Sequence, residues 1–316
     1  MYPIKFENLY YEKIWGGRKL EDYRINLPKG NIGESWEIAC HKNGMSIISN
    51  GKYKGKALIE IIKEYKNLIV GDKIYIDKFT DRNFPLLIKI INSNENLSVQ
   101  VHPNDEYAHR VENDNGKVEA WYIIDCNEGA EIIVGTTAGC TKEEFKRSCK
   151  DGTVEDCMNK ILVKPGELFL IEPGLLHSIG KGILLAEIQQ NSDITYRVYD
   201  YKRGRELHID KALDVVNFNG MPKSLCINND LVVRNHMNSE KFNIDIYNIK
   251  GSYSETSDKN KFFVFTCVEG KGKISFVDEG IRKFIDISIL ESFLIPAYLG
   301  EYILIGDMKL IKSHIF

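Results

Sequence analysis

The chain has 316 residues, of which 43% are hydrophobic and 28% are charged. Its 42 Lys and Arg residues stand against 45 Asp and Glu residues, which gives a formal net charge of −3 at pH 7. This composition supplies enough apolar material for real cores and excludes a disordered or fibrous chain, and the length predicts about two domains. Nucleic acids and anionic membrane surfaces select dense positive charge, which the sequence lacks, so we expect a small-molecule partner.

Short runs of alternating or β-branched residues, separated by Gly, Pro and Asn, predict an antiparallel β protein. In chain order, strands are expected at residues 45–49, 84–91, 97–102, 118–124, 131–135, 168–172, 184–189, 195–199, 262–269 and 302–305. Helices are expected at 56–66 and at 210–218, and a capping box at Thr141 predicts that a third helix begins there.

The chain is expected to form two lobes with a few short helices. Barrel-forming β units are predicted at about 85–200 and from about 229 to the C-terminus. The polar connection 219–229 contains Gly220, Pro222 and an Asn-Asn-Asp turn signal that begins at Asn228. We therefore predict an N-terminal lobe over residues 1–220 and a C-terminal lobe over residues 229–316.

The cellular compartment is predicted from two absences in the sequence. No apolar run is long enough to span a bilayer, and the N-terminus lacks a signal-peptide pattern, so a cytoplasmic protein is expected. The cysteines are odd in number and contain no Cys-x-x-Cys pair, which favours reduced thiols over a disulfide framework. They are Cys40, Cys126, Cys140, Cys149, Cys157, Cys226 and Cys267.

Candidate metal ligands come from two neighbouring expected strands. Residues 96–103 alternate between apolar and polar, so Gln100 and His102 project from the same strand face. By the same rule, Lys117 and Glu119 share one face of the next strand. This pattern brings an amide, an imidazole, an ammonium and a carboxylate toward one space.

A fourth candidate ligand, His177, follows a Pro-Gly turn directly after the expected strand 168–172. Together Gln100, His102, Glu119 and His177 offer two imidazoles, one carboxylate and one amide oxygen. Such a mixed nitrogen and oxygen set suits a divalent transition metal, and without a thiolate it leaves room for water or substrate. A single strand histidine is more often an ordinary hydrogen-bonded residue, so the prediction rests on the conjunction of all four.

Two further charged residues are candidates for substrate binding. Lys89 is embedded in the apolar run 84–91, which is costly unless its ammonium group faces a pocket or a partner. The alternative is a lysine on an edge strand that reaches out to solvent. Glu187, on the strand after His177, is a second possible inward carboxylate.

Four segments resemble the type I mannose-6-phosphate isomerases, a family of zinc-dependent cupins. They are QVHPND at 100–105, KVEAWY at 117–122, EPGLLHSI at 172–179 and NSDITYR at 191–197. The segments IWGG at 14–17, GESWE at 33–37 and IPA at 295–297 are similar to signatures near the two ends of the family. The chain is similar to the short bacterial branch, which lacks the helical insertion of longer members.

The resemblance implies a mostly β fold with two cupin-type (jelly-roll) barrels and one zinc ion per chain. It also implies that the chain interconverts mannose 6-phosphate and fructose 6-phosphate through an enediol. By position, Gln100, His102, Glu119 and His177 correspond to the zinc ligands, Arg197 to the catalytic arginine and Lys117 to a lysine of the same pocket.

Several assignments within this site stay open at the level of sequence. Asp193 precedes Arg197 at a spacing that puts both on one strand face, so Asp193 either orients the arginine toward the substrate or forms a structural ion pair with it. The general base is Lys117, His102, Glu187 or a bound hydroxide. The phosphate is expected to contact Lys89 or another pocket cation.

Two rival functions share the same scaffold. A non-haem iron dioxygenase uses two histidines and one carboxylate, but Gln100 and the Thr-Tyr-Arg segment that ends at Arg197 argue against it. A non-catalytic sugar-binding cupin has no need for a metal with open positions.

In the C-terminal lobe, neither His236 nor His314 has a Gln or His partner at strand spacing, so we expect no metal there.

Overall fold

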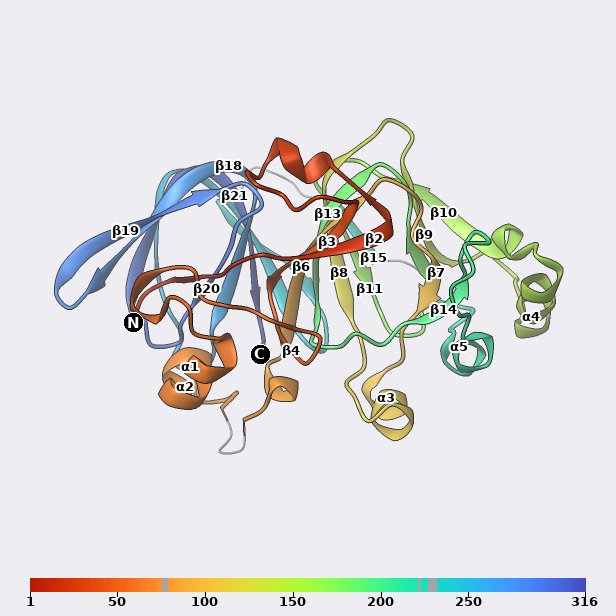
Figure 1. Cartoon of the computed structure of the whole chain (residues 1–316), viewed down its shortest axis with the longest axis horizontal. Coiled ribbons are helices and arrows are strands. Elements are labelled where there is room, and N and C mark those ends of the chain that lie inside the picture. The colour runs from red at the N-terminus through yellow and green to blue at the C-terminus, as the bar shows by residue number, and fades with distance from the viewer. Residues whose placement is uncertain (76–78, 221–222, 227–231) are drawn as a thin grey trace. The chain divides into compact units, whose positions relative to one another are not determined.

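The computed structural model describes residues 1–75, 79–220, 223–226 and 232–316. Strands dominate these residues and only short helices accompany them, which confirms the mostly β prediction (Figure 1). The expected Asn-Asn-Asp turn at 228–230 and part of the connection 219–229 lie outside the described residues. None of the helices in the described ranges has both the length and the apolar character needed to cross a membrane.

The chain forms two compact units whose segments are interleaved in sequence. The central unit contains Tyr10–Glu34 and Ile91–Cys226. The C-terminal unit contains Met1–Leu9, Ser35–Ile90 and Ile227–Phe316. The central unit ends inside the connection expected at 219–229, and the consecutive lobes 1–220 and 229–316 stay a prediction.

Two antiparallel sheets build the central unit. The five-stranded sheet has the order β10-β9-β12-β7-β14, with bounds Met158–Leu162, Glu131–Thr136, His177–Ile179, Val99–Val101 and Tyr196–Tyr199. The seven-stranded sheet has the order β15-β11-β8-β13-β6-β3-β2, with bounds Lys223–Cys226, Glu167–Ile171, Glu119–Cys126, Ile183–Gln190, Leu86–Ser93, Ile32–Ile38 and Leu9–Gly17. Strands β6 and β3 continue past the limits of this unit.

These two sheets pack face to face across an apolar core. The seven-stranded sheet contributes Trp121, Phe169 and Leu185, and the five-stranded sheet contributes Val134 and Ile179, to one buried cluster. Because side chains alternate along each strand, one face of each sheet lines this interior. Such a two-sheet sandwich is the jelly-roll arrangement.

A second apolar cluster covers the outer face of the five-stranded sheet. Val99 and Val101 of β7 meet Phe145 of α4 (Lys142–Asp151) and Leu213 of α5 (Ile209–Val215) in this cluster. Since the valines point outward, the residues between and beside them on β7 point inward. The packing of these helices thus fixes which face of β7 enters the interior.

Most helices fall where the sequence predicts them. Helix α1 (Leu58–Tyr65) lies within the expected range 56–66, and α2 (Asn67–Val70) follows it. Helix α4 begins with the predicted capping box, in which the Glu144 N–H donates to Thr141 Oγ1 at 3.2 Å. Helix α3 (Asp105–Val111) was not predicted, and Asn104 caps it by accepting a hydrogen bond from the Tyr107 N–H at 2.9 Å.

One large sheet forms most of the C-terminal unit. Its order is β1-β20-β18-β21-β17-β16, and β19 pairs with the other part of β18. The bounds are Ile4–Lys5, Ser292–Ile295, Phe263–Asp278, Glu301–His314, Asn243–Thr256 and Val233–Asn238, with β19 at Ile281–Ser288. A two-stranded ladder, β4 (Cys40–His41) and β5 (Gly44–Met45), completes this unit. The sequence predicts parts of β18 and β21, but these strands are much longer than expected.

A row of glycines crosses the three long strands of this sheet. Gly251 pairs with Gly306, and Gly306 pairs with Gly272. A Cβ atom on Gly306 would lie 2.6 Å from the Gly272 Cα, so larger residues at these positions would keep the strands farther apart.

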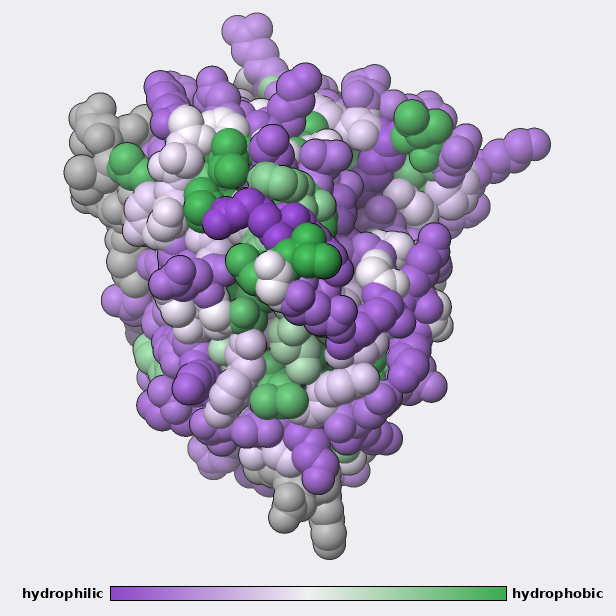
Figure 2. Space-filling view, turned by 90° about the vertical axis from the view of Figure 1, so that its left-hand side faces the viewer, coloured by the Kyte–Doolittle hydropathy of each residue, from purple (hydrophilic) through white to green (hydrophobic). Residues whose placement is uncertain are grey.

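In the space-filling view, the hydrophobic residues of the visible face lie in separate groups among hydrophilic ones (Figure 2).

Candidate metal centre

Three predicted site residues lie in a row across the five-stranded sheet. Gln100 on β7 is paired with His177 on β12 and with Arg197 on β14. Directly opposite residues of antiparallel strands share a face, so the three side chains point to the same side. His102 follows Gln100 by two residues and lies on that face as well. This face is the interior of the sandwich.

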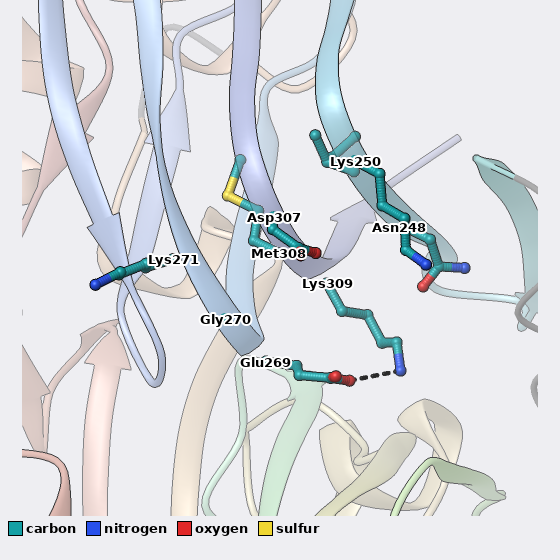
Figure 3. Close-up of a pocket in the computed structure, with 9 residues that line it drawn as sticks. Asn248, Lys250, Glu269, Gly270, Lys271, Asp307, Met308 and Lys309 are labelled. Carbon is teal, nitrogen blue, oxygen red and sulfur yellow. Dashed lines mark hydrogen bonds and ion pairs between the residues drawn. The ribbon is translucent and has the colours of Figure 1, made fainter.

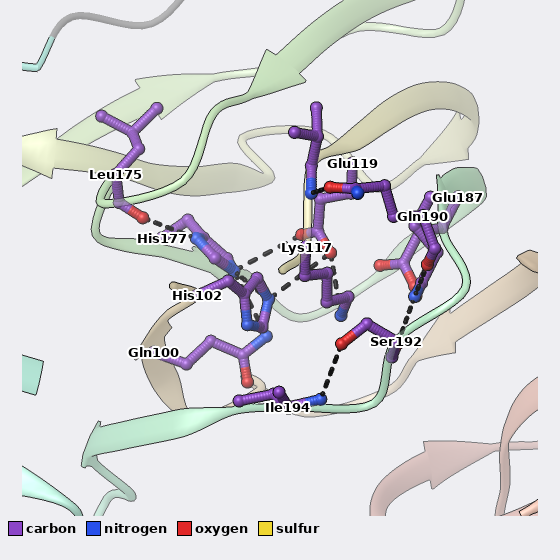
Figure 4. A network of polar contacts seen from close by, with 12 residues as sticks. Gln100, His102, Lys117, Glu119, Leu175, His177, Glu187, Gln190, Ser192 and Ile194 are labelled. Atoms are coloured by element: carbon purple, nitrogen blue, oxygen red, sulfur yellow. Dashed lines mark hydrogen bonds and ion pairs between the residues drawn. The ribbon is translucent and has the colours of Figure 1, made fainter. Parts of the chain in front are cut away.

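Glu119, at the start of β8, reaches the same space from the seven-stranded sheet (Figure 4). Its Oε2 lies 3.5 Å from His102 Nε2, and its Oε1 lies 3.4 Å from His177 Nε2. The two histidine Nε2 atoms are 3.1 Å apart. Among the described residues, this is the one group of three or more His, Cys, Asp or Glu side chains whose ligand atoms converge tightly enough for a metal ion.

Burial determines the protonation states in this cluster. It lowers the pKa of His102 to about 3, with a smaller contribution from the Lys117 ammonium, and it lowers the pKa of His177 as well. For Glu119 burial acts against ionisation, yet Lys117 and the two imidazoles hold the carboxyl pKa well below its usual range. At neutral pH the cluster therefore presents two neutral imidazoles and one carboxylate.

The histidine orientations show that a cation fits between these groups. His177 Nδ1 lies 2.8 Å from the Leu175 carbonyl oxygen, so Nδ1 carries the proton and Nε2 presents a lone pair to the cluster. His102 Nε2 is also directed there, and both oxygens of the fully buried Glu119 carboxylate face the two histidines. Lone pairs and a carboxylate that converge in a buried space form the donor set of a metal site.

Gln100 lies at the edge of this donor set. Its amide nitrogen is 3.3 Å from His177 Nε2. Turning the amide by 180° brings Oε1 to the same position, where it can act as a fourth donor. Gln100 is also more exposed than the three other candidate ligands.

Lys117 provides a positive charge inside the cluster. Its side chain is 5% exposed, and its Nζ lies 2.9 Å from Glu119 Oε2. Strand β8 begins at Glu119, so Lys117 lies in the segment just before the strand and not on the strand itself. The predicted proximity of the two residues is nevertheless present in the structure.

Arg197 is held by two contacts on the same sheet face. Its Nε donates to Ser98 Oγ at 3.2 Å, and its Nη1 donates to the Glu206 carbonyl oxygen at 2.9 Å. Ser98 was not assigned a role from sequence, although the alternation of β7 already places it on the face of Gln100. Strand β14 begins at Tyr196, so Asp193 precedes the strand and does not share its face. An Asp193–Arg197 pair stays a prediction.

Two more arginines lie close to Arg197, and sequence reasoning missed them. Arg203 and Arg205 both bind the buried carboxylate of Asp200, at 2.8 Å from Arg203 Nη2 and 2.9 Å from Arg205 Nε. Burial opposes ionisation of Asp200, but the two arginines lower its pKa below the ordinary value. The charge-rich run after the expected strand 195–199 was the available signal. Its positive charge exceeds its negative charge, which favours anions nearby.

The two other predicted substrate-binding residues have different surroundings. Glu187 on β13 is 5% exposed, and its Oε2 accepts a hydrogen bond from Trp121 Nε1 at 3.2 Å. Lys89 on β6 belongs to the C-terminal unit, where its Nζ lies 5.2 Å from the centre of the Trp36 ring. Both side chains are buried, as a role in a pocket requires, and both substrate-binding roles stay predictions.

A separate pocket of about 560 Å³ lies in the C-terminal unit (Figure 3). Lys250, Lys271 and Lys309 line it together with Glu269 and Asp307. Lys309 Nζ and Glu269 Oε2 form an ion pair at 2.8 Å. This lining contains no imidazole or thiol, so the pocket lacks the donors that a transition metal prefers.

Comparison with known proteins identifies the family. A model of the type I phosphomannose isomerase catalytic domain matches residues 4–148, and a model of the mannose-6-phosphate isomerase cupin domain matches residues 233–315. The chain is 38% identical over 327 residues to the mannose-6-phosphate isomerase ManA of Bacillus subtilis strain 168, and the match covers 99% of each protein. The chain belongs to the type I phosphomannose isomerase family.

Similarity to further relatives supports membership of this family. The mannose-6-phosphate isomerase of Streptococcus mutans is 34% identical, over 99% of this chain and 98% of the relative. The crystal structure of the Bacillus subtilis mannose 6-phosphate isomerase superposes with a TM-score of 0.89 at 34% identity, over all of both chains. Phosphomannose isomerase variants from Salmonella typhimurium share the fold, with a TM-score of 0.79 at 16% identity. The predicted cupin-type fold class is thus confirmed.

Proposed function

We propose that the chain is a zinc-dependent isomerase that interconverts mannose 6-phosphate and fructose 6-phosphate. Family membership supports the reaction, since relatives matched over nearly the whole chain are named as mannose-6-phosphate isomerases. The single structural observation that carries the proposal is the convergence of His102, Glu119 and His177 in a buried space. Aldose–ketose isomerisation develops negative charge on sugar oxygens, and a cation at this place would stabilise it.

We assign Gln100, His102, Glu119 and His177 as the ligands of one zinc ion per chain. A zinc ion held there would supply a Lewis acid for the negative charge that develops on the sugar oxygens. The Leu175 carbonyl keeps His177 in the tautomer with Nε2 free, and the low pKa of His102 keeps its ring neutral at the pH of the cell. Glu119 supplies the negative charge of the donor set.

Arg197 and Lys117 are proposed to act on the substrate directly. The Ser98 hydroxyl and the Glu206 carbonyl fix two nitrogens of the Arg197 guanidinium, so the group presents its planar face in one orientation. From the row that it shares with Gln100, it would stabilise the oxyanion of the enediol. Lys117, in the segment just before β8 and next to Glu119, would stabilise the same charge.

A base must also move the carbon-bound proton between C1 and C2 of the sugar. His102 directs Nε2 at the metal position, so as a ligand it has no lone pair on that nitrogen for the sugar. Glu187 is an inward carboxylate on β13 whose Oε2 is oriented by Trp121. We therefore favour Glu187 or Lys117 as the proton acceptor.

A coupled assay with mannose 6-phosphate tests the proposal. Formation of fructose 6-phosphate would be followed with the purified protein, with protein stripped by a chelator, and with stripped protein to which zinc is returned. We expect activity to disappear on stripping and to return with about one zinc per chain. Full activity in chelated protein that contains no metal would refute zinc dependence.

Variants connect this assay to the proposed ligands. His177→Ala removes a ligand that no neighbour can replace, so zinc content and turnover should fall together. His109→Ala, which changes an exposed histidine of α3, is the matched control. An oxygen-uptake assay distinguishes the dioxygenase alternative, since the isomerase consumes no oxygen.

A further inference from the structure

Three of the six cysteines that the structure describes as free lie together around helix α4. Cys140 directly precedes the N-cap Thr141, Cys149 lies in the last turns of α4, and Cys157 ends the following 3-10 turn, Val154–Cys157. All three are partly exposed and pack against the apolar cluster on the outer face of the five-stranded sheet. This cluster of thiols has no part in the proposed isomerase site.

Two of these cysteines are fixed close to each other by the backbone. The Cys140 N–H donates to the Thr137 carbonyl at 3.1 Å, and the Thr137 N–H donates to the Cys157 carbonyl at 3.0 Å. The Cys157 thiol donates to Ser148 Oγ at 3.4 Å, and it lies close enough to the Cys140 thiol to raise the pKa of that thiol. We therefore expect a rotation of the two side chains to bring the sulfur atoms within bonding distance.

The same two thiols line a surface pocket of about 360 Å³. Glu144, Arg147 and Asp156 line it as well, whereas Cys149 does not. The pocket therefore offers a small disulfide access to Cys140 and Cys157 but not to Cys149.

We propose that Cys140 and Cys157 are a reversible dithiol–disulfide pair that a low-molecular-weight disulfide oxidises. The Cys157 thiol loses its proton to water, and its thiolate attacks one sulfur of the small disulfide, so that one small thiolate leaves. The Cys140 thiol then loses its proton and attacks the Cys157 sulfur, and the second small thiolate leaves. Two cysteines are oxidised by two electrons, one small disulfide is reduced, and each released thiolate takes up a proton.

The order of these two attacks follows from the surroundings of Cys140. Burial, aided by the neighbouring Cys157 thiol, raises the pKa of the Cys140 thiol to about 12. Near neutral pH this thiol is almost entirely protonated and is a slow first nucleophile. The reaction should accordingly accelerate as the pH rises from 7 to 9.

The cross-link would enclose α4 and fasten it to the core behind the candidate metal centre. The apolar cluster that contacts the three thiols also contains Val99 and Val101 of β7, and Leu176 next to His177. Joining the ends of the segment 140–157 restricts the unfolded chain more than the folded one. The oxidised protein should therefore hold this segment more firmly, a property that goes beyond the proposed isomerase activity.

The test uses zinc-loaded protein incubated with oxidised glutathione at pH 8. Free thiols should fall from seven to five per chain, and dithiothreitol should restore them. Lys142, Lys146, Arg147 and Lys150 place Cys140, Cys149 and Cys157 on different tryptic peptides, so mass spectrometry identifies the linked pair. Fragmentation of the linked peptide distinguishes Cys140 from Cys126, which shares its tryptic peptide. The midpoint of thermal unfolding should rise by about 5 °C on oxidation.

Matched serine variants make this test decisive. Cys149→Ser should still form the cross-link, whereas Cys140→Ser and Cys157→Ser should lose both the cross-link and the thermal shift. A cross-link that contains Cys149 would overturn the proposal. So would protein that keeps seven free thiols or carries only glutathione adducts.

Discussion

Lys117 Nζ lies 2.9 Å from Glu119 Oε2 inside the interior of the central sandwich, and the two side chains are 5% and 0% exposed. An ammonium and a carboxylate at this depth compensate each other, because neither could remain charged alone. The two imidazoles approach the same carboxylate from the other sheet. Glu119 is thus the anion around which both the lysine and the proposed metal are organised.

Glu119→Gln should weaken both zinc binding and the fold. The amide is nearly isosteric, but it leaves Lys117 buried without a counter-charge, which costs about 3–5 kcal/mol where a buried pair is broken. We expect the variant to lose most of its zinc in a chelator competition and to unfold at lower urea concentration. Glu128→Gln, an exposed acid with no such partner, serves as the control. Wild-type zinc affinity in Glu119→Gln would show that the carboxylate is not a ligand.

The metal-free protein should lose stability in mild acid. Burial lowers the pKa of His102 from 6.5 to about 3, so between these values the unfolded chain binds a proton that the folded chain does not. Stability then falls as the pH decreases, by roughly 1 kcal/mol per pH unit from this histidine. The lowered pKa of Glu119 acts in the same direction at lower pH.

Urea unfolding of the metal-free protein at pH 7.5, 6.0 and 5.0 checks this sign. The free energy of unfolding should decrease across the series, and His102→Asn should reduce the slope, since the amide does not titrate. A stability that is flat or rises toward pH 5 would mean that His102 is protonated in the folded state.

The sequence predicted the central unit better than the C-terminal unit, for a physical reason. Alternation on β7 is clear because Val99 and Val101 pack on an apolar cluster while Gln100 between them points to the other side. In contrast, β17 and β18 continue through glycines and charged residues, where the alternating pattern weakens. Helix α3 was missed because its seven residues are too few for a clear apolar stripe, although Asn104 was a usable cap signal.

The sequence predicted the residues of the candidate metal centre, but not the neighbouring residues and strand pairings that position them. Strand spacing and a family resemblance named His102, Glu119 and His177, and the structure brings these three together. Period-two alternation says which face a side chain takes, but not which strands become neighbours. The pairing of β14 with β7, which places Arg197 opposite Gln100, is a non-local contact. For the same reason Ser98 was not recognised as a neighbour of Arg197.

Arg197→Lys should lower kcat by roughly 10²-fold or more while zinc content and folding remain intact. Lysine keeps the positive charge but cannot bind Ser98 and Glu206 while also presenting a fork to the enediol oxygen. KM should change less, because the phosphate is assigned to other cations. Ser98→Ala, which removes one support of the guanidinium, should lower kcat by a smaller factor.

Steady-state kinetics and circular dichroism of these variants would be compared with Arg110→Lys, an exposed arginine of α3. Normal turnover in Arg197→Lys would mean that the arginine is structural. The electrostatic role would then belong to Lys117.

The interior of the C-terminal unit contains its own buried cation, Lys312. Its Nζ forms an ion pair with Glu255, lies 3.2 Å from the Tyr247 hydroxyl, and sits 3.6 Å from the centre of the Phe263 ring. Tyr302 also donates to Glu255, at 2.8 Å. An ammonium already compensates the carboxylate here, so the group has no need of a metal ion.

Lys312→Met should therefore destabilise the protein without changing its zinc content. The methionine fills most of the space but leaves Glu255 without its cation, at a cost of about 2–3 kcal/mol because Tyr247 and Tyr302 still donate to the carboxylate. Adding Glu255→Gln to this variant removes the uncompensated charge and should restore much of the loss. Urea unfolding and elemental analysis of the single and double variants measure the two effects. A second zinc ion in the native protein that Lys312→Met lacked would contradict this prediction. It would mean that the C-terminal unit contains a metal.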